Sequence, residues 1–499
     1  MTALVTLRSF VMTGTTVLLA ACAVGPDYRA PEAPASSPYT ERPQPERTEA
    51  AAVRGGEAQR FEVGAEISAD WWKLFGSAAL DEMIRTALAG HPTLAAARAT
   101  LRQAQENLNA QYSVLYPSVD ASLSAKRQRT SGASFGNPSL PNNTFSLYNA
   151  SVNVSYAIDL AGGARRELEA LEAGIDFQRF QLEAAYLSLT ANVATTTFRE
   201  ASLREQIRAT REIVEAQSRQ LQLVEKQLAL GAISRADVLG QRTQLALSRA
   251  TLPPLEKALA QTRNQLAVLI GKFPGEAMLP ELDLAAFRLP QALPVSLPSD
   301  LVRQRPDIRA AEAILQQTNA RIGVAHALMF PQLTLSGSYG SAAIGTGNLF
   351  DPGTQIWNIG ASLLQPIFHA GQLEARKRGA VAAYDQAFAL YRQTVLGAFQ
   401  NVADVLLALE FDAVALKAQA EAEAAARESL EVTRAQLQFG SANYLALLNA
   451  ERQYEQARIG LVQAQAARFA DTAALFQALG GGWWRRGDRA REAPSTVAN

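Results

Sequence analysis

Few side chains in this sequence could carry chemistry. The chain of 499 residues has one cysteine, Cys22, and three histidines, His91, His326 and His369. A zinc site needs several such ligands at short spacing, and these four residues are far apart. We find no catalytic triad, no phosphate-binding glycine loop and no paired carboxylates at a catalytic spacing. The sequence therefore predicts neither an enzyme nor a metal cofactor.

The single thiol falls where covalent lipid attachment would require it. Residues 1–21 carry one charge followed by an apolar stretch, the layout of a secretory signal. The stretch ends in a lipobox-like sequence, Leu19-Ala20-Ala21-Cys22. We expect cleavage between Ala21 and Cys22 and acylation of the new N-terminal cysteine, which anchors a protein without spanning the bilayer. In bacterial lipoproteins, aspartate after the cysteine favours retention at the inner membrane. Residue 23 is alanine here, so we expect the outer membrane.

The overall charge excludes one class of partner. The 47 Lys and Arg residues balance the 47 Asp and Glu residues, which gives a formal net charge of +0. A nucleic-acid-binding protein needs a basic surface, so we expect no nucleic acid. Hydrophobic residues make up 48% of the chain, enough for a large core. No uninterrupted apolar run has the length of a transmembrane helix, so none is expected.

The chain contains an internal repeat of about 209 residues, which determines how its elements are arranged. His91-Pro92 corresponds to Arg305-Pro306, and Leu269-Ile270-Gly271 corresponds to Ala478-Leu479-Gly480. Each half reads as helix, strand, strand, very long helix and shorter helix. The resulting segments are a signal peptide at 1–21, a lipidated tether at 22–60, a first repeat at 61–271, a linker at 272–297, a second repeat at 298–482 and a C-terminal tail at 483–499.

The very long helices are identified by missing prolines and by heptads. No proline occurs from Asn142 to Leu252 or from Ile367 to Ala493, and we expect helices over about 165–229 and 371–438. Each would be on the order of 100 Å long. Apolar residues seven apart, a series that Glu423 interrupts, indicate coiled-coil packing against neighbours.

Four segments alternate between apolar and small polar residues, which is typical of membrane β-strands around a wet lumen. They are residues 118–128, 147–160, 331–342 and 355–368. Four strands cannot close a pore, and open edges are not tolerated in lipid, so the barrel must be shared between chains. Three chains would supply twelve strands.

With these features in place, the sequence resembles the outer-membrane efflux proteins of the TolC type, specifically the lipoprotein branch of outer-membrane factors. The resemblance covers the mature chain and is carried by the duplication and by residues 22–28, 70–75 and 305–307. Trp71 and Trp72 in the second motif could bind a ligand through their aromatic faces. A packing role, fixing the N-terminal segment to the body, is the preferred interpretation.

The resemblance implies a fold and a set of partners. The fold is mainly α with a membrane β-barrel: a homotrimer whose 12-stranded β-barrel is continuous with a 12-helix α-barrel tunnel through the periplasm. The protein would be lipid-anchored in the bacterial outer membrane through Cys22 and need no other cofactor. A periplasmic adaptor and an inner-membrane pump of the resistance-nodulation-division type would deliver small toxic compounds to it.

The resemblance also implies where the tunnel meets the adaptor and where it closes. The helical turns at Gly231-Ala232 and Gly440-Ser441 would form the periplasmic tip. Many family members constrict the pore with acidic residues just past the tip. Aligned through Gly440, those positions are Ala446 and Asn449, so an aspartate ring is absent there, and Asp237 is the nearest carboxylate past the first turn. We expect closure by inward coiling with Asp237 or Asn449 at the constriction.

Two other functions fit parts of the pattern. One is an outer-membrane duct for type I protein secretion, and the other is a periplasmic coiled-coil scaffold lipoprotein. The lipid anchor and the branch-specific motifs favour small-molecule efflux over protein secretion. The four amphipathic strands of membrane length argue against a scaffold.

Overall fold

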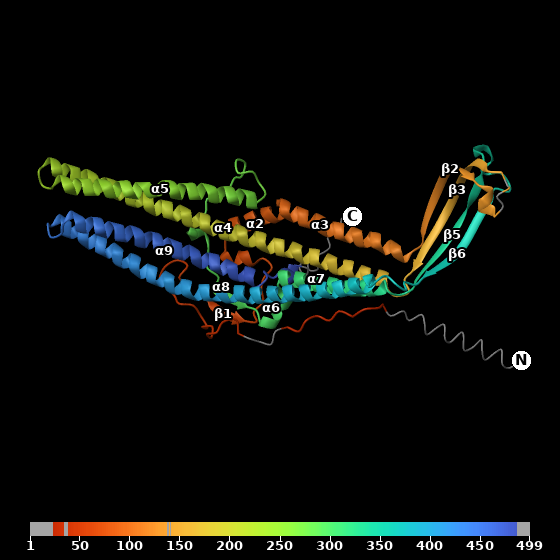
Figure 1. The fold of residues 1–499 in the computed structure, drawn as a ribbon. Coiled ribbons are helices and arrows are strands. Elements are labelled where there is room, and N and C mark those ends of the chain that lie inside the picture. The colour runs from red at the N-terminus through yellow and green to blue at the C-terminus, as the bar shows by residue number, and fades with distance from the viewer. Residues whose placement is uncertain (1–22, 34–37, 137–138, 140, 487–499) are drawn as a thin grey trace, which may run out of the picture. The chain divides into compact units, whose positions relative to one another are not determined.

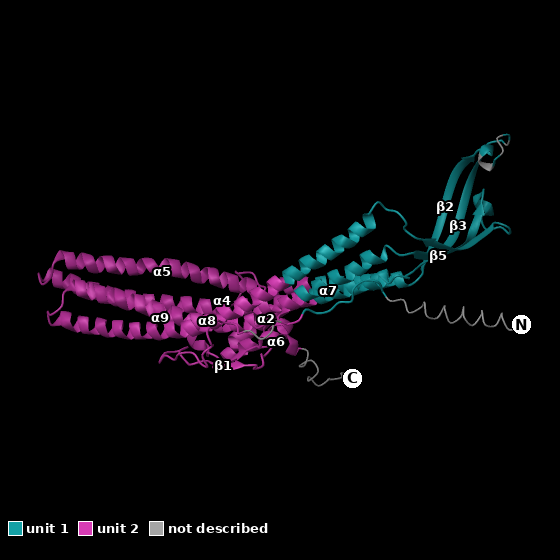
Figure 2. Ribbon diagram, turned by 60° about the horizontal axis from the view of Figure 1, so that its bottom comes forward, with its two compact units in different colours: residues 1–31, 100–178, 311–391 teal, residues 32–99, 179–310, 392–499 magenta. Residues whose placement is uncertain are grey.

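The computed structural model of the chain describes residues 23–33, 38–136, 139 and 141–486. Cys22, the cleavage site after Ala21, and the tail from residue 487 lie outside the described residues. The chain forms two compact units (Figure 2). Unit 1 contains the residues up to 31, 100–178 and 311–391, and unit 2 contains residues 32–99, 179–310 and those from 392 onwards.

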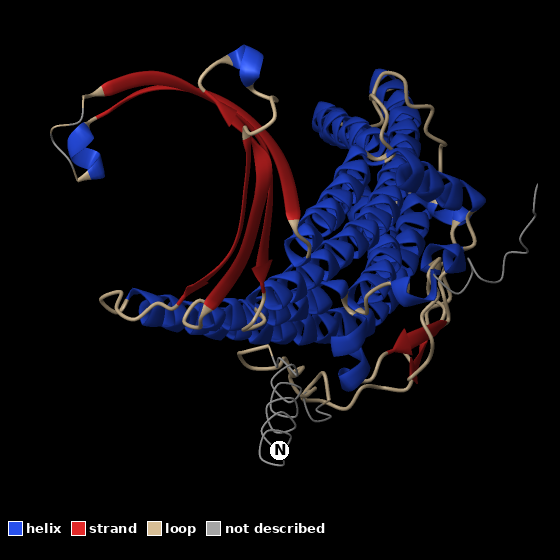
Figure 3. Ribbon diagram, turned by 90° about the vertical axis from the view of Figure 1, so that its right-hand side faces the viewer, coloured by secondary structure: helices blue, strands red, loops and turns tan. Residues whose placement is uncertain are grey.

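Unit 1 is built around a four-stranded antiparallel sheet with the order β2-β3-β5-β6. The strands are β2 (Ser118–Thr130), β3 (Asn143–Ile158), β5 (Gln332–Ala343) and β6 (Gln355–Leu364). Figure 3 shows that the sheet curves into an open arc. Among the described residues, β2 and β6 each pair on one side only, so one chain does not close the sheet into a barrel.

The two faces of this sheet differ in chemistry, as the alternation predicts. Leu123 lies opposite Ala150 on the apolar face, and Ser122 lies opposite Ser151 on the other. The Ser122 and Ser151 hydroxyls are 2.9 Å apart, and the amide of Asn153 donates to Ser122 Oγ at 3.0 Å. One face therefore suits lipid and the other suits an aqueous lumen.

Several strands begin or end at residues other than those predicted, because hydrogen-bond pairing with the neighbouring strand sets their ends. β3 begins at Asn143, four positions before the predicted 147, because Asn143 pairs with Thr130 at the extended end of β2. β6 ends at Leu364, not at 368. Pro366 has no backbone N–H to continue a ladder, so pairing stops just before it. β5 is shifted by one residue from its prediction.

The predicted long helices are present. α4 (Gly163–Ala229) and α8 (Gln372–Gln438) have 67 residues each, and their partners α5 (Arg235–Leu269) and α9 (Tyr444–Ala478) have 35 each. The remaining helices are α2 (Ala78–Gly90), α3 (Pro92–Tyr112), α6 (Pro298–Gln304) and α7 (Pro306–Ala327) (Figure 1). The two halves of the chain thus repeat the same order of elements.

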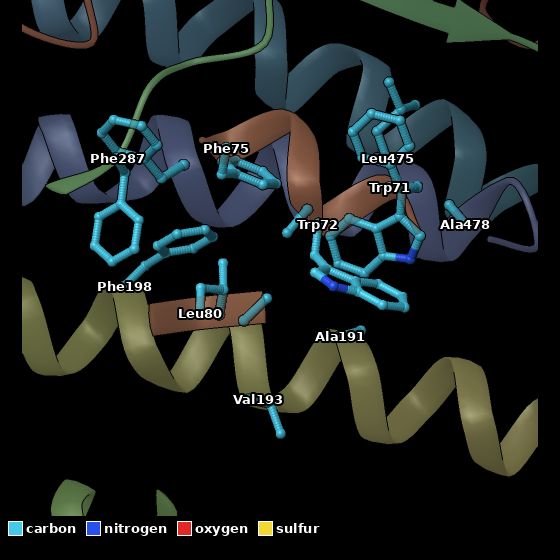
Figure 4. Packing of buried hydrophobic residues seen from close by; sticks show 14 of the residues in the cluster. Trp71, Trp72, Phe75, Leu80, Ala191, Val193, Phe198, Phe287, Leu475 and Ala478 are labelled. Carbon is cyan, nitrogen blue, oxygen red and sulfur yellow. The ribbon is translucent and has the colours of Figure 1, made fainter. Parts of the chain in front are cut away.

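An aromatic core holds unit 2 together. Trp71 is 1% exposed and stacks on Phe476, with ring centroids 5.4 Å apart and an interplanar angle of 11°. Figure 4 shows Trp71 and Trp72 among buried side chains that include Phe75 and Phe198. The indole N–H of Trp72 donates to the Asp81 carboxylate at 2.9 Å. The packing role predicted for the tryptophan pair is confirmed.

A small parallel sheet was missed by the sequence patterns. β1 (Arg60–Val63) pairs with β4 (Ala292–Val295), which joins the end of the expected tether to the expected linker. Gln59 beside it is fully buried, and its amide donates to Pro290 O and to Thr472 Oγ1. Four-residue strands in proline-rich sequence carry too little periodicity to be recognised.

One helix has membrane-like composition. Within the described residues, α8 is the one helix that combines the length of a membrane span with an apolar stretch nearly free of charge, and 33% of that stretch is buried in the chain. Length and composition alone would let it cross a membrane, contrary to the expectation from the sequence. A single helix of this kind does not indicate a membrane span, because core helices of soluble proteins have the same length and composition. Leu407, Phe411 and Val414, at spacings of one helical turn, form part of its exposed apolar stripe.

Candidate functional site

The first candidate tip is the turn between α4 and α5. Gly231 has φ of 75°, a left-handed conformation that strains any residue with a Cβ. Its N–H donates to Leu228 O at 2.9 Å, and the next N–H, of Ala232, donates to Gln227 O at 2.9 Å. This pair of bonds is a Schellman motif, which satisfies the last carbonyls of α4.

The second turn repeats the first. Gly440 has φ of 74°, its N–H donates to Leu437 O, and the N–H of Ser441 donates to Gln436 O at 2.9 Å. Asn443 then caps α9 by accepting from the N–H of Ala446 at 2.9 Å. Both connections therefore use the same geometry, and in Figures 1 and 2 both turns lie at the same end of unit 2.

Each turn exposes a large apolar side chain at the same position. Leu230 is 84% exposed and Phe439 is 85% exposed, and each immediately precedes the turn glycine. A single exposed apolar residue is ordinary on a protein surface. Two of them at equivalent positions, on the turn ends of both hairpins, make a surface suited to another apolar surface.

The three gate candidates occupy different environments. The Asp237 carboxylate accepts from the backbone N–H of Ser234 at 3.1 Å and from its hydroxyl at 2.6 Å, so it completes the capping box of α5. Ala446 contributes only its backbone N–H to the cap of α9. Asn449 is exposed, and its side-chain oxygen accepts from Arg452. Helix capping therefore accounts for Asp237 without a gate.

Tyr444 joins the two hairpins near the turns, and the sequence patterns did not single it out. Its hydroxyl donates to the Gln227 side chain on α4, and burial followed by the negative charge of Asp237 raises its pKa. It belongs to a small apolar cluster drawn from all four helices, whose other buried members are Val224, Val238, Leu430, Leu447 and Ala450. The turn ends of the hairpins are thus packed together.

Behind this cluster the contact between hairpins is polar. Glu451 on α9 is 3% exposed and accepts from the Gln241 amide of α5 at 3.4 Å. Glu455, one turn further on, accepts from the Ser248 hydroxyl at 3.0 Å. Burial raises the pKa of both carboxyls. Glu423, which interrupts the apolar heptads, is also buried and lies 3.9 Å from Arg458 of α9.

A cavity of about 190 Å³ with both polar and apolar walls lies beside these residues, between α4, α8 and α9. Gln217 on its wall is 1% exposed, and neither its side-chain nitrogen nor its oxygen has a hydrogen-bond partner among the described residues. The wall also includes Arg434, Glu451 and Arg458. Such a cavity can hold water. This interface is therefore less tightly packed than an apolar coiled coil.

The residues that follow the predicted lipidation site, Cys22, are held in place on unit 1. Arg166 donates to Val24 O at 3.3 Å and pairs with Asp27 at 2.8 Å, and the amide of Asn319 donates to Pro26 O at 2.9 Å. The N–H of Val24 donates to Ala161 O, between β3 and α4. Cys22 itself is outside the described residues, but its neighbours sit beside the end of a barrel strand.

The chain matches known proteins along most of its length. The model of the family described as Outer membrane efflux protein matches twice, at residues 83–272 and 297–481. The pyoverdine export outer membrane protein OpmQ of Pseudomonas aeruginosa is 33% identical over 420 residues, covering 83% of this chain and 87% of that protein. The antibiotic efflux pump outer membrane protein ArpC of Pseudomonas putida is 30% identical over 486 residues, covering 96% and 97%.

A solved structure agrees with the sequence relatives. The outer-membrane channel OprN superposes with a TM-score of 0.83 at 28% identity, covering 93% of this chain and 100% of that chain. The fold predicted from strand alternation, long helices and duplication is confirmed. The chain belongs to the outer membrane efflux protein family: it is a non-enzymatic outer-membrane channel protein of the efflux type, with the fold of that family's trimeric channels.

Proposed function

We propose that three copies of the chain close one barrel and one helical tunnel, which together form the export duct of a tripartite pump. Two observations support the trimer. The edges of the four-stranded sheet, β2 and β6, are open in the single chain. The exposed apolar stripe of α8 at Leu396, Leu407, Phe411 and Val414 would be covered by a neighbouring copy.

The duct is fixed to the outer membrane by lipid on Cys22. The contacts of Arg166 and Asn319 with residues 24–27 support this, because they seat the first mature residues beside the membrane sheet. An acyl chain on Cys22 would then enter the leaflet at the foot of the barrel. The proposal includes cleavage after Ala21 and the division of the chain into signal peptide, tether, two repeats, linker and tail at the bounds predicted from the sequence.

The partner that meets the turns is a periplasmic adaptor, which couples the duct to an inner-membrane pump of the resistance-nodulation-division type. The single observation that carries this assignment is the matched pair of turns, each with an exposed apolar side chain before its glycine, Leu230 and Phe439. In a trimer these turns would form a ring of six apolar contacts around Gly231, Ala232, Gly440 and Ser441.

The cargo is a class of small, toxic organic compounds. The relatives are named for the export of pyoverdine and of antibiotics. The chain supplies a passage, and the pump supplies the energy.

Closure of the passage takes place at the turn ends, by inward coiling of the hairpins past their polar contact surface. Asp237, with Asn449 and Ala446 on the second hairpin, lies at the expected constriction. Asp237→Ala removes both a charge and a helix cap, whereas Ser234→Ala removes only the cap. A conductance change in planar bilayers for Asp237→Ala alone would support a gate, and equal changes in both would assign the effect to the cap.

The function is tested by deleting the gene and restoring wild type or a Leu230→Asp/Phe439→Asp variant. We expect deletion to sensitise cells to dyes, detergents and antibiotics, and the double variant to restore a trimer without resistance. Asp in place of exposed apolar residues leaves the fold intact but opposes apolar docking. Full resistance with the double variant would refute the adaptor assignment. Unchanged susceptibility after deletion, with loss of a secreted protein, would favour type I secretion.

A further inference from the structure

Two arginines stand on the apolar face of the sheet, at the end of β2 that is furthest along the strand from α3. Arg127 lies opposite Ser146, and Arg129 lies opposite Thr144. Their positions alternate in phase with Val119 and Leu123 of the same strand, so the four residues share one face. Both arginines are exposed.

The apolar band below them has the height of a membrane. On β3 this face carries no charged residue from Tyr148 to Ile158. That run is about 34 Å long at 3.4 Å per residue, or about 25 Å in height for a strand tilted by about 40°. Tyr148, opposite Ala125, marks its upper end, and Arg127 is the next residue of β2 on that face.

This end of the sheet faces the cell exterior if the proposed function holds, since the helices that precede β2 and follow β3 are periplasmic. Arg127 and Arg129 then lie at the level of the outer leaflet headgroups. An arginine on the lipid face is costly at mid-bilayer and nearly free at the interface. Among the described residues, neither guanidinium has an ion pair or hydrogen bond, so both charges are available to a ligand.

We propose that Arg127 and Arg129 bind the phosphate groups of an anionic glycolipid in the outer leaflet. Each guanidinium presents paired N–H donors that match two phosphate oxygens. The hydroxyls of Ser146 and Thr144, directly opposite on β3, add donors on the same face. The site rests on the proposed orientation of the channel and adds a specific lipid contact to it. The bound lipid covers the end of the β2 edge, where neighbouring copies would meet.

The test uses the full-length protein purified in neutral detergent and titrated with a bisphosphorylated lipid A-type glycolipid. The probe is compared with the same glycolipid after removal of its phosphates. The variant is Arg127→Gln/Arg129→Gln. The matched control is Lys126→Gln, because Lys126 lies at the same strand end on the opposite, polar face.

We expect wild type and Lys126→Gln to bind the phosphorylated lipid equally and the double variant to bind about 30-fold more weakly, because each basic residue at an anionic surface typically contributes about fivefold and the variant removes two. The dephosphorylated lipid should bind wild type as weakly as the phosphorylated lipid binds the double variant. Equal binding by wild type and the double variant, or equal binding of the two lipids, would overturn the proposal.

A structural explanation is tested separately. Asp351, near the start of β6, could pair with these arginines across a contact between copies. If the double variant and Asp351→Asn both destabilise the trimer in lipid-free detergent, and lipid affinity is unchanged, the arginines serve assembly and the lipid site is refuted. Trimer formation and conductance of wild type are recorded first, because their absence would refute the proposed function itself.

Discussion

Replacing Arg468 with methionine should release the N-terminal segment from the body of unit 2. Arg468 is fully buried on α9 and is among the largest buried side chains. Its guanidinium donates to Glu57 O at 3.0 Å, to Leu409 O of α8 at 3.4 Å and to Thr48 Oγ1 at 3.5 Å. One arginine thus connects α8, α9 and the segment that leads back in sequence to Cys22, the proposed lipid anchor.

The size of the effect follows from these contacts. A hydrogen bond from a charged donor contributes about 1.5–3 kcal/mol, and the bond to Glu57 O has a short, favourable distance. The two longer bonds contribute less, and the buried Nε, without a partner among the described residues, subtracts from the total. Methionine preserves most of the packing. The net loss is about 2–3 kcal/mol, or roughly a 30- to 150-fold increase in segment opening.

Limited trypsin digestion of the native protein measures this opening. Cleavage after Arg54, between Thr48 and Gln59, reports release of the segment, and its rate follows the opening equilibrium when reclosing is fast. Arg452→Met is the control, because Arg452 is on the same helix but exposed. A cleavage rate for Arg468→Met within about threefold of wild type would refute the assignment, since the predicted loss is far larger.

Three further outcomes are expected. Gly440→Ala should lower stability by about 1–2 kcal/mol in chemical denaturation because of its left-handed backbone, whereas Gly397→Ala inside α8 should not lower it. Burial, a hydrogen bond to Asp471 and the charge of that residue raise the pKa of Asp412 to about 7, above its unfolded value of 3.8. The contribution of Asp412 to the free energy of unfolding is therefore fully present below about pH 4 and is lost as the pH rises through 7. Wild type should melt at a lower temperature at pH 8 than at pH 6, and Asp412→Asn should remove most of that difference. Trp71→Ala should cost about 3–5 kcal/mol and Trp71→Phe less, which thermal melts would compare; equal losses would contradict the stacking role.

Much of the architecture could be predicted from the sequence because it depends on periodic patterns. Alternation located the four strands, and the absence of proline with apolar heptads located α4 and α8. Glycines at equivalent places located both turns, Gly231 and Gly440. These patterns report backbone geometry and which face is apolar, and both are local properties of the chain.

The buried polar groups could not be predicted in the same way. No sequence pattern marks Arg468 and Gln217 as buried, because their environment comes from segments that are distant in sequence. Charge and position make Asp237 a gate candidate, whereas its additional role as a helix cap is visible only in the hydrogen bonds of the structure. The one sequence signal for the polar contact between the hairpins is Glu423, a carboxylate within the apolar heptads, and the heptad pattern does not identify its partner.

The shared barrel is the central claim, and cross-linking between copies tests it most directly. Leu123→Cys on β2 is combined in turn with cysteine at Trp357, Ile359 or Ala361 on β6, which samples the register between the two edges. Cys22 is the only native cysteine, so background cross-links are few. After mild oxidation, we predict covalent dimers and trimers on a denaturing gel for at least one pair, with no larger species. Covalent dimers without trimers, covalent species larger than trimers, or no cross-link with any cysteine pair would contradict the account.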